Sequence, residues 1–67
     1  MVTNMSDVSS VRYVEHNKGI TIIHLTNMGQ ITLDRHITAE EGDSVRYKTN
    51  FKDSSLQELY INEIRVY

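Results

Sequence analysis

Three glycines punctuate the chain, and each follows a short polar cluster beside a segment in which apolar and polar residues alternate. Gly19 and Gly29 end clusters that fit three-residue hairpin loops, with glycine in the left-handed conformation. Gly42 lies in a slightly longer connection of the same general kind. Alternation with a period of two is typical of strands that bury one face. The chain is therefore predicted to fold as antiparallel strands joined by glycine-containing turns.

Four strands are expected from this pattern, at residues 10–16, 20–26, 30–38 and 44–51. If the loops set the register, the hairpins bring apolar residues onto one face, and a slip of one residue would reverse every side chain. The partners expected on that face are Val11 with Leu25, Tyr13 with Ile23, Leu25 with Ile31, Ile23 with Leu33, Ile37 with Val45, Arg35 with Tyr47, and Ile31 with Phe51. Because turn chemistry and alternation agree, we expect a four-stranded antiparallel meander.

The C-terminal part of the chain has to cover the apolar face of this meander, and two interpretations remain open. Overlapping capping-box patterns that begin at Ser54 and Ser55 predict a helical turn over residues 54–59. Residues 60–66 are rich in β-branched and aromatic side chains, which favours a fifth strand that closes a mainly β small barrel. The alternative is an α+β fold, in which one helix over residues 55–65 covers the four-stranded sheet.

The order of four strands, a short helical turn and a last strand resembles that of SH3-like small barrels, over residues 10–67. The acidic and aromatic ligand groove of true SH3 domains is not evident in the sequence. The resemblance therefore implies an architecture and does not imply a function.

Length and composition limit the chain to one small domain. With 67 residues it lies near the lower limit for a domain that folds alone, and 39% hydrophobic residues suffice for a core. We expect a single β domain over residues 9–67 after a flexible lead of residues 1–8. The sequence contains no cysteine, no signal-peptide pattern and no apolar run long enough to cross a membrane. The expectation is a cytoplasmic protein without a membrane partner.

The sequence offers few residues for catalysis or for a metal site. The three histidines are expected on the face opposite the core, where His16 and His36 lie two strand spacings apart, about 9–10 Å. Rings at that distance do not share a metal, and no cysteine or dense carboxylate cluster completes a ligand set. No nucleophile elbow and no phosphate-binding glycine loop occur, and Glu40 and Glu41 lie in a solvated turn. We therefore expect no enzymatic activity, cofactor, metal or small-molecule substrate.

The same register predicts an exposed apolar patch on the face opposite the core. Its centre is formed by Val14, Ile20 and Ile22. The polar residues expected around this centre are Arg12, His16, His24, Asp34 and His36. An apolar centre with a polar rim is typical of protein interfaces, although β-branched residues also favour strands wherever they fall, and a curled sheet can bury both faces. The favoured hypothesis is a non-enzymatic protein-interaction module or accessory subunit that binds a protein partner or itself, as a homodimer.

The alternative function is that of a small β-barrel that binds single-stranded nucleic acid. The cations available for phosphate contacts are Arg12, Lys18, Arg46, Lys48 and Lys52, and the aromatic residues available for stacking are Tyr13, Tyr47 and Phe51. The predicted register buries these aromatic residues and places Arg46 and Lys48 on the other face. With a net charge of −2 and with acids among its bases, the chain has no basic stripe. Nucleic acid is therefore the less favoured partner.

Overall fold

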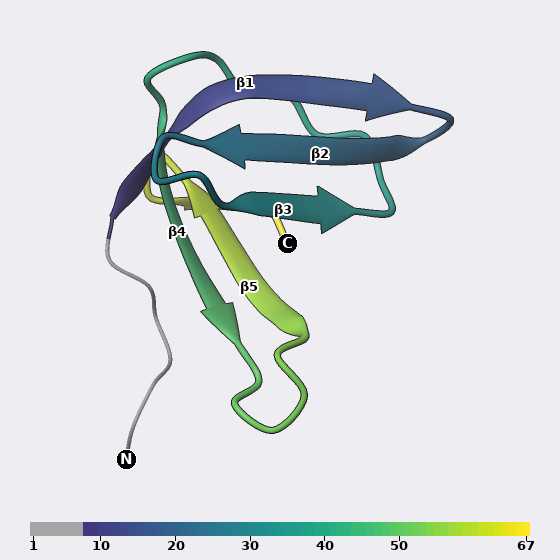
Figure 1. The fold of residues 1–67 in the computed structure, drawn as a ribbon, viewed down its shortest axis with the longest axis vertical. Helices are drawn as coiled ribbons and strands as arrows, with labels where there is room; N and C mark the ends of the chain where they lie inside the picture. The colour runs from purple at the N-terminus through teal and green to yellow at the C-terminus, as the bar shows by residue number, and fades with distance from the viewer. Residues whose placement is uncertain (1–7) are drawn as a thin grey trace.

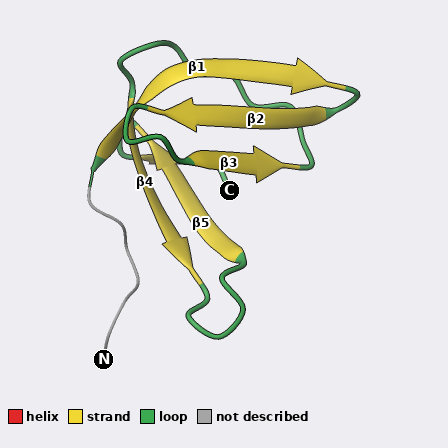
Figure 2. Ribbon diagram, viewed as in Figure 1, coloured by secondary structure: helices red, strands yellow, loops and turns green. Residues whose placement is uncertain are grey.

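Residues 8–67 are described by the computed structural model, and they form one open sheet of six antiparallel strands. The strands are β1 (Ser9–Asn17), β2 (Ile20–Leu25), β3 (Gln30–Leu33), β4 (Ser44–Thr49), β5 (Leu56–Ile61) and β6 (Ile64–Arg65). Their order across the sheet is β3-β2-β1-β4-β5-β6. Figure 2 shows strands and loops and, within the described residues, no helix. The prediction of a mainly β, antiparallel fold is confirmed.

The prediction for the C-terminal half is wrong in three respects. Residues 54–67 contain no helical turn and no helix that covers the sheet, and the sheet does not close into a barrel. Residues 54–59 lead directly into β5. The hydroxyl and the N–H of Ser55 both donate to the carboxylate of Asp53, so the polar residues that resemble a helix cap form a turn before a strand. Asn62 and Glu63 have φ of 52° and 65°, and they make the turn that separates β5 from β6.

Two further expectations concern the N-terminal residues and the possibility of a membrane-spanning segment. The flexible lead expected at residues 1–8 lies, apart from Val8, outside the described residues. Over residues 8–67 there is no helix that could span a membrane.

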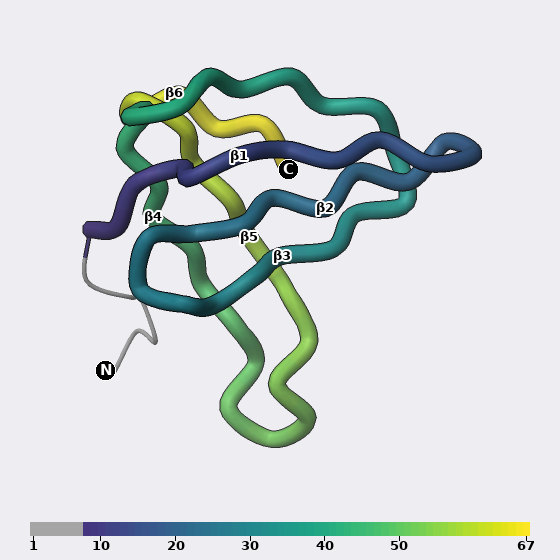
Figure 3. Tube along the Cα trace, turned by 45° about the horizontal axis from the view of Figure 1, so that its top comes forward, coloured from purple at the N-terminus to yellow at the C-terminus, as the bar shows by residue number. Residues whose placement is uncertain are grey.

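Strand β1 belongs to both halves of the sheet. Its first residues pair with β4, Ser9 with Val45 and Ser10 with Ser44, whereas the rest of the strand pairs with β2. The sheet therefore has two arms, β1–β2–β3 and β4–β5–β6, which run crosswise to each other (Figure 1). The β4–β5 hairpin projects beyond the edge of β3 in both views (Figure 1, Figure 3).

The predicted pairing of β4 with β3 is wrong, because residues 34–43 do not form a hairpin loop. They cross the inner face of β2, where the completely buried side chain of Thr21 holds them. Its Oγ1 donates a hydrogen bond to the Arg35 carbonyl at 2.7 Å and accepts one from the Ile37 N–H at 3.0 Å. Ile37 is thereby buried in the core, whereas Phe51, predicted in the core, is 80% exposed beyond the end of β4.

The first hairpin turns through two residues, whereas a three-residue loop was predicted. Lys18 and Gly19 have φ of 52° and 82°. Two successive positive φ angles define the type I′ turn, whose twist matches that of the strands it joins. Asn17 therefore pairs with Ile20, so the part of β1 next to this turn presents each side chain to the opposite face from the predicted one.

A β-bulge at Arg12 returns β1 to its predicted register. The bulge lies between Val11 and Tyr13, and Val11 keeps its predicted partner in β2. Tyr13, predicted in the core, is shifted outward and is 45% exposed. Val14 takes the inner position and packs against the core.

Strand β3 pairs with β2 two residues away from the predicted register, with Ile23 opposite Ile31 and Thr21 opposite Leu33. A shift of two residues keeps every side chain of β3 on its predicted face. The buried apolar residues are Val11, Ile23, Leu25, Ile31, Leu33, Ile37, Val45, Leu59 and Ile61. The two arms and the connection after β3 thus share one core, which leaves the opposite face of the β1–β2–β3 arm for other roles.

Candidate interaction surface

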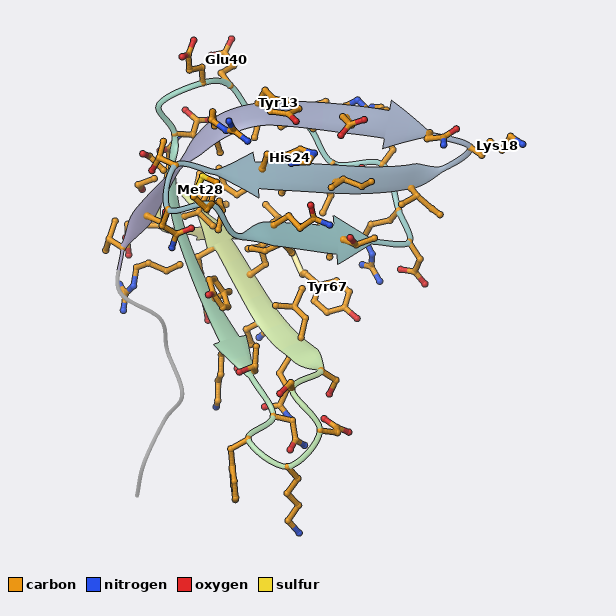
Figure 4. The ribbon with its side chains drawn as sticks, viewed as in Figure 1. Tyr13, Lys18, His24, Met28, Glu40 and Tyr67 are labelled. Atoms are coloured by element: carbon orange, nitrogen blue, oxygen red, sulfur yellow. The ribbon has the colours of Figure 1, made fainter. Side chains whose placement is uncertain are left out.

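One face of the β1–β2–β3 arm points away from the core, and we call it the outer face. Its side chains come from alternate residues of the three strands: Tyr13, Glu15 and Asn17 of β1, Ile20, Ile22 and His24 of β2, and Gln30 and Thr32 of β3. At its centre, Ile20 is 41% exposed and Ile22 is half-buried. No described strand covers this face (Figure 1), and Tyr13 and His24 lie beside each other on it (Figure 4).

The structure brings together four of the eight residues predicted at the interface. Ile20, Ile22 and His24 share the outer face as expected. Arg12 lies at its rim, at the bulge, where its guanidinium carbon is 5.0 Å from the centre of the Tyr13 ring. A cation over an aromatic ring at this distance is attracted by the electron-rich ring face.

The other four predicted residues are not on the outer face of the strands. Val14 packs against the core, and His16 lies on the inner side opposite Thr21, so their predicted placement is wrong. Asp34 and His36 follow β3 in the connection and form part of no strand, and Asp34 borders the outer face beside Ile20 and Thr32. The two-residue turn moves Val14 and His16 inward, and the chain leaves the sheet before it reaches His36.

Tyr13 is the aromatic residue of this surface that the sequence prediction missed. Its ring stacks on that of His24 with centroids 4.1 Å apart and planes 13° from parallel. The Nε2 of His24 donates a hydrogen bond to the Glu15 carboxylate. The turn at Lys18 and Gly19 explains the difference, because a two-residue turn there exchanges the faces of β1, and lysine gives no signal of the positive φ that this turn requires. The outer face thus has an ordered polar and aromatic border along β1.

His16 and His36 form a second aromatic pair, on the inner side of the same arm. Their rings stack with centroids 4.2 Å apart, in place of the predicted separation of two strand spacings. The Nε2 of His16 donates to the carbonyl of Ile37 at 2.8 Å, so this ring ties β1 to the connection that follows β3. Within residues 8–67, no group of three or more His, Cys, Asp or Glu side chains could hold a metal ion.

Two cations of the β4–β5–β6 arm, Arg46 and Lys48, are paired with carboxylates. The Nη1 of Arg46 lies 3.0 Å from Oε1 of Glu63, and the Nζ of Lys48 lies 3.9 Å from Oε2 of Glu58. The Tyr60 hydroxyl donates to Glu58 at 2.6 Å, and this hydrogen bond lowers the pKa of Glu58 and raises the pKa of Tyr60. Phosphate groups that contacted Arg46 or Lys48 would have to displace these two carboxylates.

Comparison of the chain with protein-family models, with curated proteins and with solved structures finds no match. A functional conclusion therefore has to come from the chemistry of the outer face. Its three components are an apolar centre, a stacked aromatic border and a small set of charges of both signs.

Proposed function

We propose that this chain is a non-enzymatic protein-interaction module that docks through the outer face. The observation that carries the proposal is the exposed Ile20 and the half-buried Ile22 on the same sheet face as the exposed Tyr13 ring, a face that no described strand covers. Interfaces combine such an apolar and aromatic centre with a polar rim. Glu15, Thr32 and the other polar residues of the outer face supply the rim.

The contacts among the side chains of this face support the proposal. Side chains that are ordered before binding lose less conformational entropy when a partner covers them. The Tyr13 ring is already held by His24, and His24 is held by Glu15. The role of an accessory subunit in the cytoplasm, expected from the sequence, forms part of the same proposal.

A second copy of the chain is the partner that the charges of this face fit best. In a symmetric dimer the same patch meets itself, so it must be self-complementary. Arg12 and Glu15 lie on the same border of the outer face and carry opposite charges. A two-fold axis near Ile22 would bring apolar centre onto apolar centre and would allow Arg12 of one copy to face Glu15 of the other.

The test is the mass of the protein in solution, measured by size-exclusion chromatography with light scattering. We expect the wild type to approach twice its monomer mass of 7.8 kDa as its concentration is raised to about 1 mM. Ile22→Glu should remain monomeric. Ile64→Glu is the matched control, because Ile64 is 67% exposed on β6, in the other arm, and this variant should associate as the wild type does. A wild type that stays monomeric, or an unaffected Ile22→Glu, contradicts the proposal.

Binding of single-stranded nucleic acid is the second candidate. The predicted register placed aromatic and basic residues on opposite faces, but one observation from the structure favours this candidate. Arg12 lies over the exposed Tyr13 ring, so one cation and one stacking surface do share the outer face. Fluorescence anisotropy with a labelled oligonucleotide at two salt concentrations tests this candidate, because phosphate contacts weaken as salt rises. Binding that falls steeply with salt and is lost in Tyr13→Ala supports it, and no binding at low salt removes it.

A further inference from the structure

Strand β3 is the last strand of the sheet on its side, and its outer edge has no partner among the described strands. In an antiparallel ladder, alternate residues direct both backbone groups to the neighbouring strand. The Leu25 N–H donates to the Gly29 carbonyl at 2.9 Å, so Ile31 and Leu33 are the residues of β3 that continue this ladder toward β2. The N–H and C=O groups of Gln30 and Thr32 therefore point to the open edge.

This edge has one of the features that usually prevent strand pairing, since β3 is only four residues long, and it lacks the others. Native proteins protect open edges with short strands, with lysine, with proline, with inward-pointing charges or with a bulge. The residues of β3 are Gln30, Ile31, Thr32 and Leu33, which include no charged residue and no proline, and the ladder with β2 has no bulge. The edge is thus chemically ready to accept a further strand.

Two pockets lie along the open edge, one on each side of Thr32. Both are bounded by Thr32 and by Leu56 at the start of β5. The first, of about 380 Å³, extends toward Ile31 and Tyr47, and the second, of about 330 Å³, extends toward Leu33 and Tyr67. These volumes are at the lower end of the range for ligand sites, and both pockets have apolar side chains in their lining.

The arrangement of the two pockets matches that of side chains on an extended strand. Side chains on one face of a strand are two residues apart, which corresponds to roughly 6.6–6.8 Å. A strand added beside β3 with its middle residue opposite Thr32 would place its neighbouring side chains opposite Ile31 and Leu33. Those two side chains would point inward, one into each pocket.

The β4–β5 hairpin provides a floor for such a strand. It projects beyond the edge of β3 (Figure 1, Figure 3), and Tyr67 lies between that edge and β5 (Figure 4). The Arg35 guanidinium carbon is 4.4 Å from the centre of the Tyr67 ring, which holds that ring at the second pocket. If two copies paired through β3, each would bring its own hairpin to the same place. The space therefore fits a single extended peptide better than a second copy of this chain.

We propose that the open edge of β3 binds an extended peptide segment of a partner protein, which adds a strand and places aliphatic side chains at positions i and i+2 into the two pockets. Main-chain hydrogen bonds to Gln30 and Thr32 hold the segment, and the pockets select its side chains. The site adjoins the outer face, because Ile20 lines the second pocket and Thr32 lines both. Ile22 lines neither pocket, so the peptide site does not depend on the dimer proposed above.

The experiment is an NMR titration of the ¹⁵N-labelled protein with the blocked heptapeptide Lys-Thr-Val-Thr-Val-Thr-Lys. We expect binding with a Kd below about 1 mM, with the largest amide shifts at Gln30 and Thr32. Methylation of the backbone nitrogen of the middle threonine should weaken binding at least about tenfold, because it removes the N–H that bonds to Thr32. Replacement of both valines by glutamate should abolish binding.

The protein variants isolate the open edge. Thr32→Pro removes an N–H that points away from β2, so the strand should persist while peptide affinity falls at least about tenfold. Thr32→Val keeps the backbone donor and should bind as the wild type does. Ile22→Glu should also bind normally, so failure of the outer-face dimer and failure of this site are distinguishable.

Three results would overturn the proposal. The first is no amide shift at millimolar peptide, and the second is equal binding of the N-methylated peptide by the wild type. The third is a wild-type dimer that dissociates in Thr32→Pro, since a second copy would then occupy the edge. Because the N-methylated peptide is tested on the wild-type protein, the conclusion holds even if Thr32→Pro does not fold.

Discussion

Neighbouring residues of β2 differ sharply in their surroundings. Ile23 is completely buried, whereas the adjacent Ile22 lies half-buried on the outer face. Thr21 is also completely buried, although the more apolar Ile20 beside it is 41% exposed. The Thr21 hydroxyl is needed inside because it bonds the connection after β3. The comparison teaches that the face of β2 on which a residue lies, and the hydrogen bonds that it makes there, decide its burial more than its hydrophobicity does.

The largest expected effect contrasts the two adjacent isoleucines. Ile23→Ala should lower the free energy of unfolding by about 2–5 kcal/mol, because it leaves a cavity in the core. Ile22→Ala should lower it by less than about 1 kcal/mol, since the side chain is only half-buried. Urea unfolding followed by circular dichroism measures both values. Similar losses for the two variants would mean that both faces of β2 are core.

The next effect concerns the buried hydroxyl. Thr21→Val should cost about 1–3 kcal/mol of unfolding free energy, because the Arg35 carbonyl and the Ile37 N–H would lose their partner. Thr32→Val, the same change on the exposed edge strand, should stay within about 0.5 kcal/mol of the wild type. The same urea titration compares the two. Equal effects would show that the connection after β3 is not held through Thr21.

A smaller effect is expected at the border of the outer face. Tyr13→Ala should cost about 0.5–1.5 kcal/mol, because it removes the stack on His24. It should also shift the His24 ring protons downfield, since they lie against the Tyr13 ring. Tyr13→Phe keeps the ring and serves as the control in both the NMR spectrum and the unfolding curve. Unchanged His24 proton shifts in Tyr13→Ala would refute the stacked arrangement.

The smallest effect is a pH dependence of stability through Asp43. Its carboxylate accepts a hydrogen bond from the Glu40 N–H at 3.0 Å, and this bond, with a further one from the Asn62 side chain, lowers the pKa of Asp43 from its ordinary value of 3.8. A lowered folded-state pKa gives stability that is complete above the unfolded pKa and is lost as pH falls through the folded pKa. The melting temperature of the wild type should therefore fall between about pH 5 and pH 2 more than that of Asp43→Asn. Parallel pH profiles of the two proteins would contradict this role.

The sequence predicted the parts of the fold that local chemistry determines. Alternation in β2 assigned Ile23 to the core and Ile22 to the outer face correctly, and the two-residue shift of β3 preserved its faces. The positive φ of Lys18 was not predictable from residue preference, since turn positions with positive φ favour glycine and asparagine. The resulting change of face moved Tyr13 outward and Val14 inward, so only part of the predicted set of residues lies on the outer face.

The pairing of β4 with β1 could not be predicted from the sequence. Glycine turns specify contacts between neighbouring segments, but they do not specify which distant strand completes the sheet. Thr21 bonds Arg35 and Ile37 where the connection crosses the inner face, and an isolated threonine in an alternating segment carries no signal of that role. The crossing of residues 34–43 over β2 brings His36 onto the His16 ring. It also carries the chain to β4, so that the β4–β5 hairpin lies beneath the open edge of β3.

The outer edge of β3 is open because β4 pairs with β1, and the peptide site requires this open edge. Hydrogen exchange of the four amides of β3 tests whether the edge is open. The ladder with β2 protects the N–H groups of Ile31 and Leu33, so these amides should exchange slowly. The N–H groups of Gln30 and Thr32 face solvent, so they should exchange at least about tenfold faster in the isolated protein. Uniform slow exchange of all four amides would mean that another strand covers this edge, as in the meander or the closed barrel.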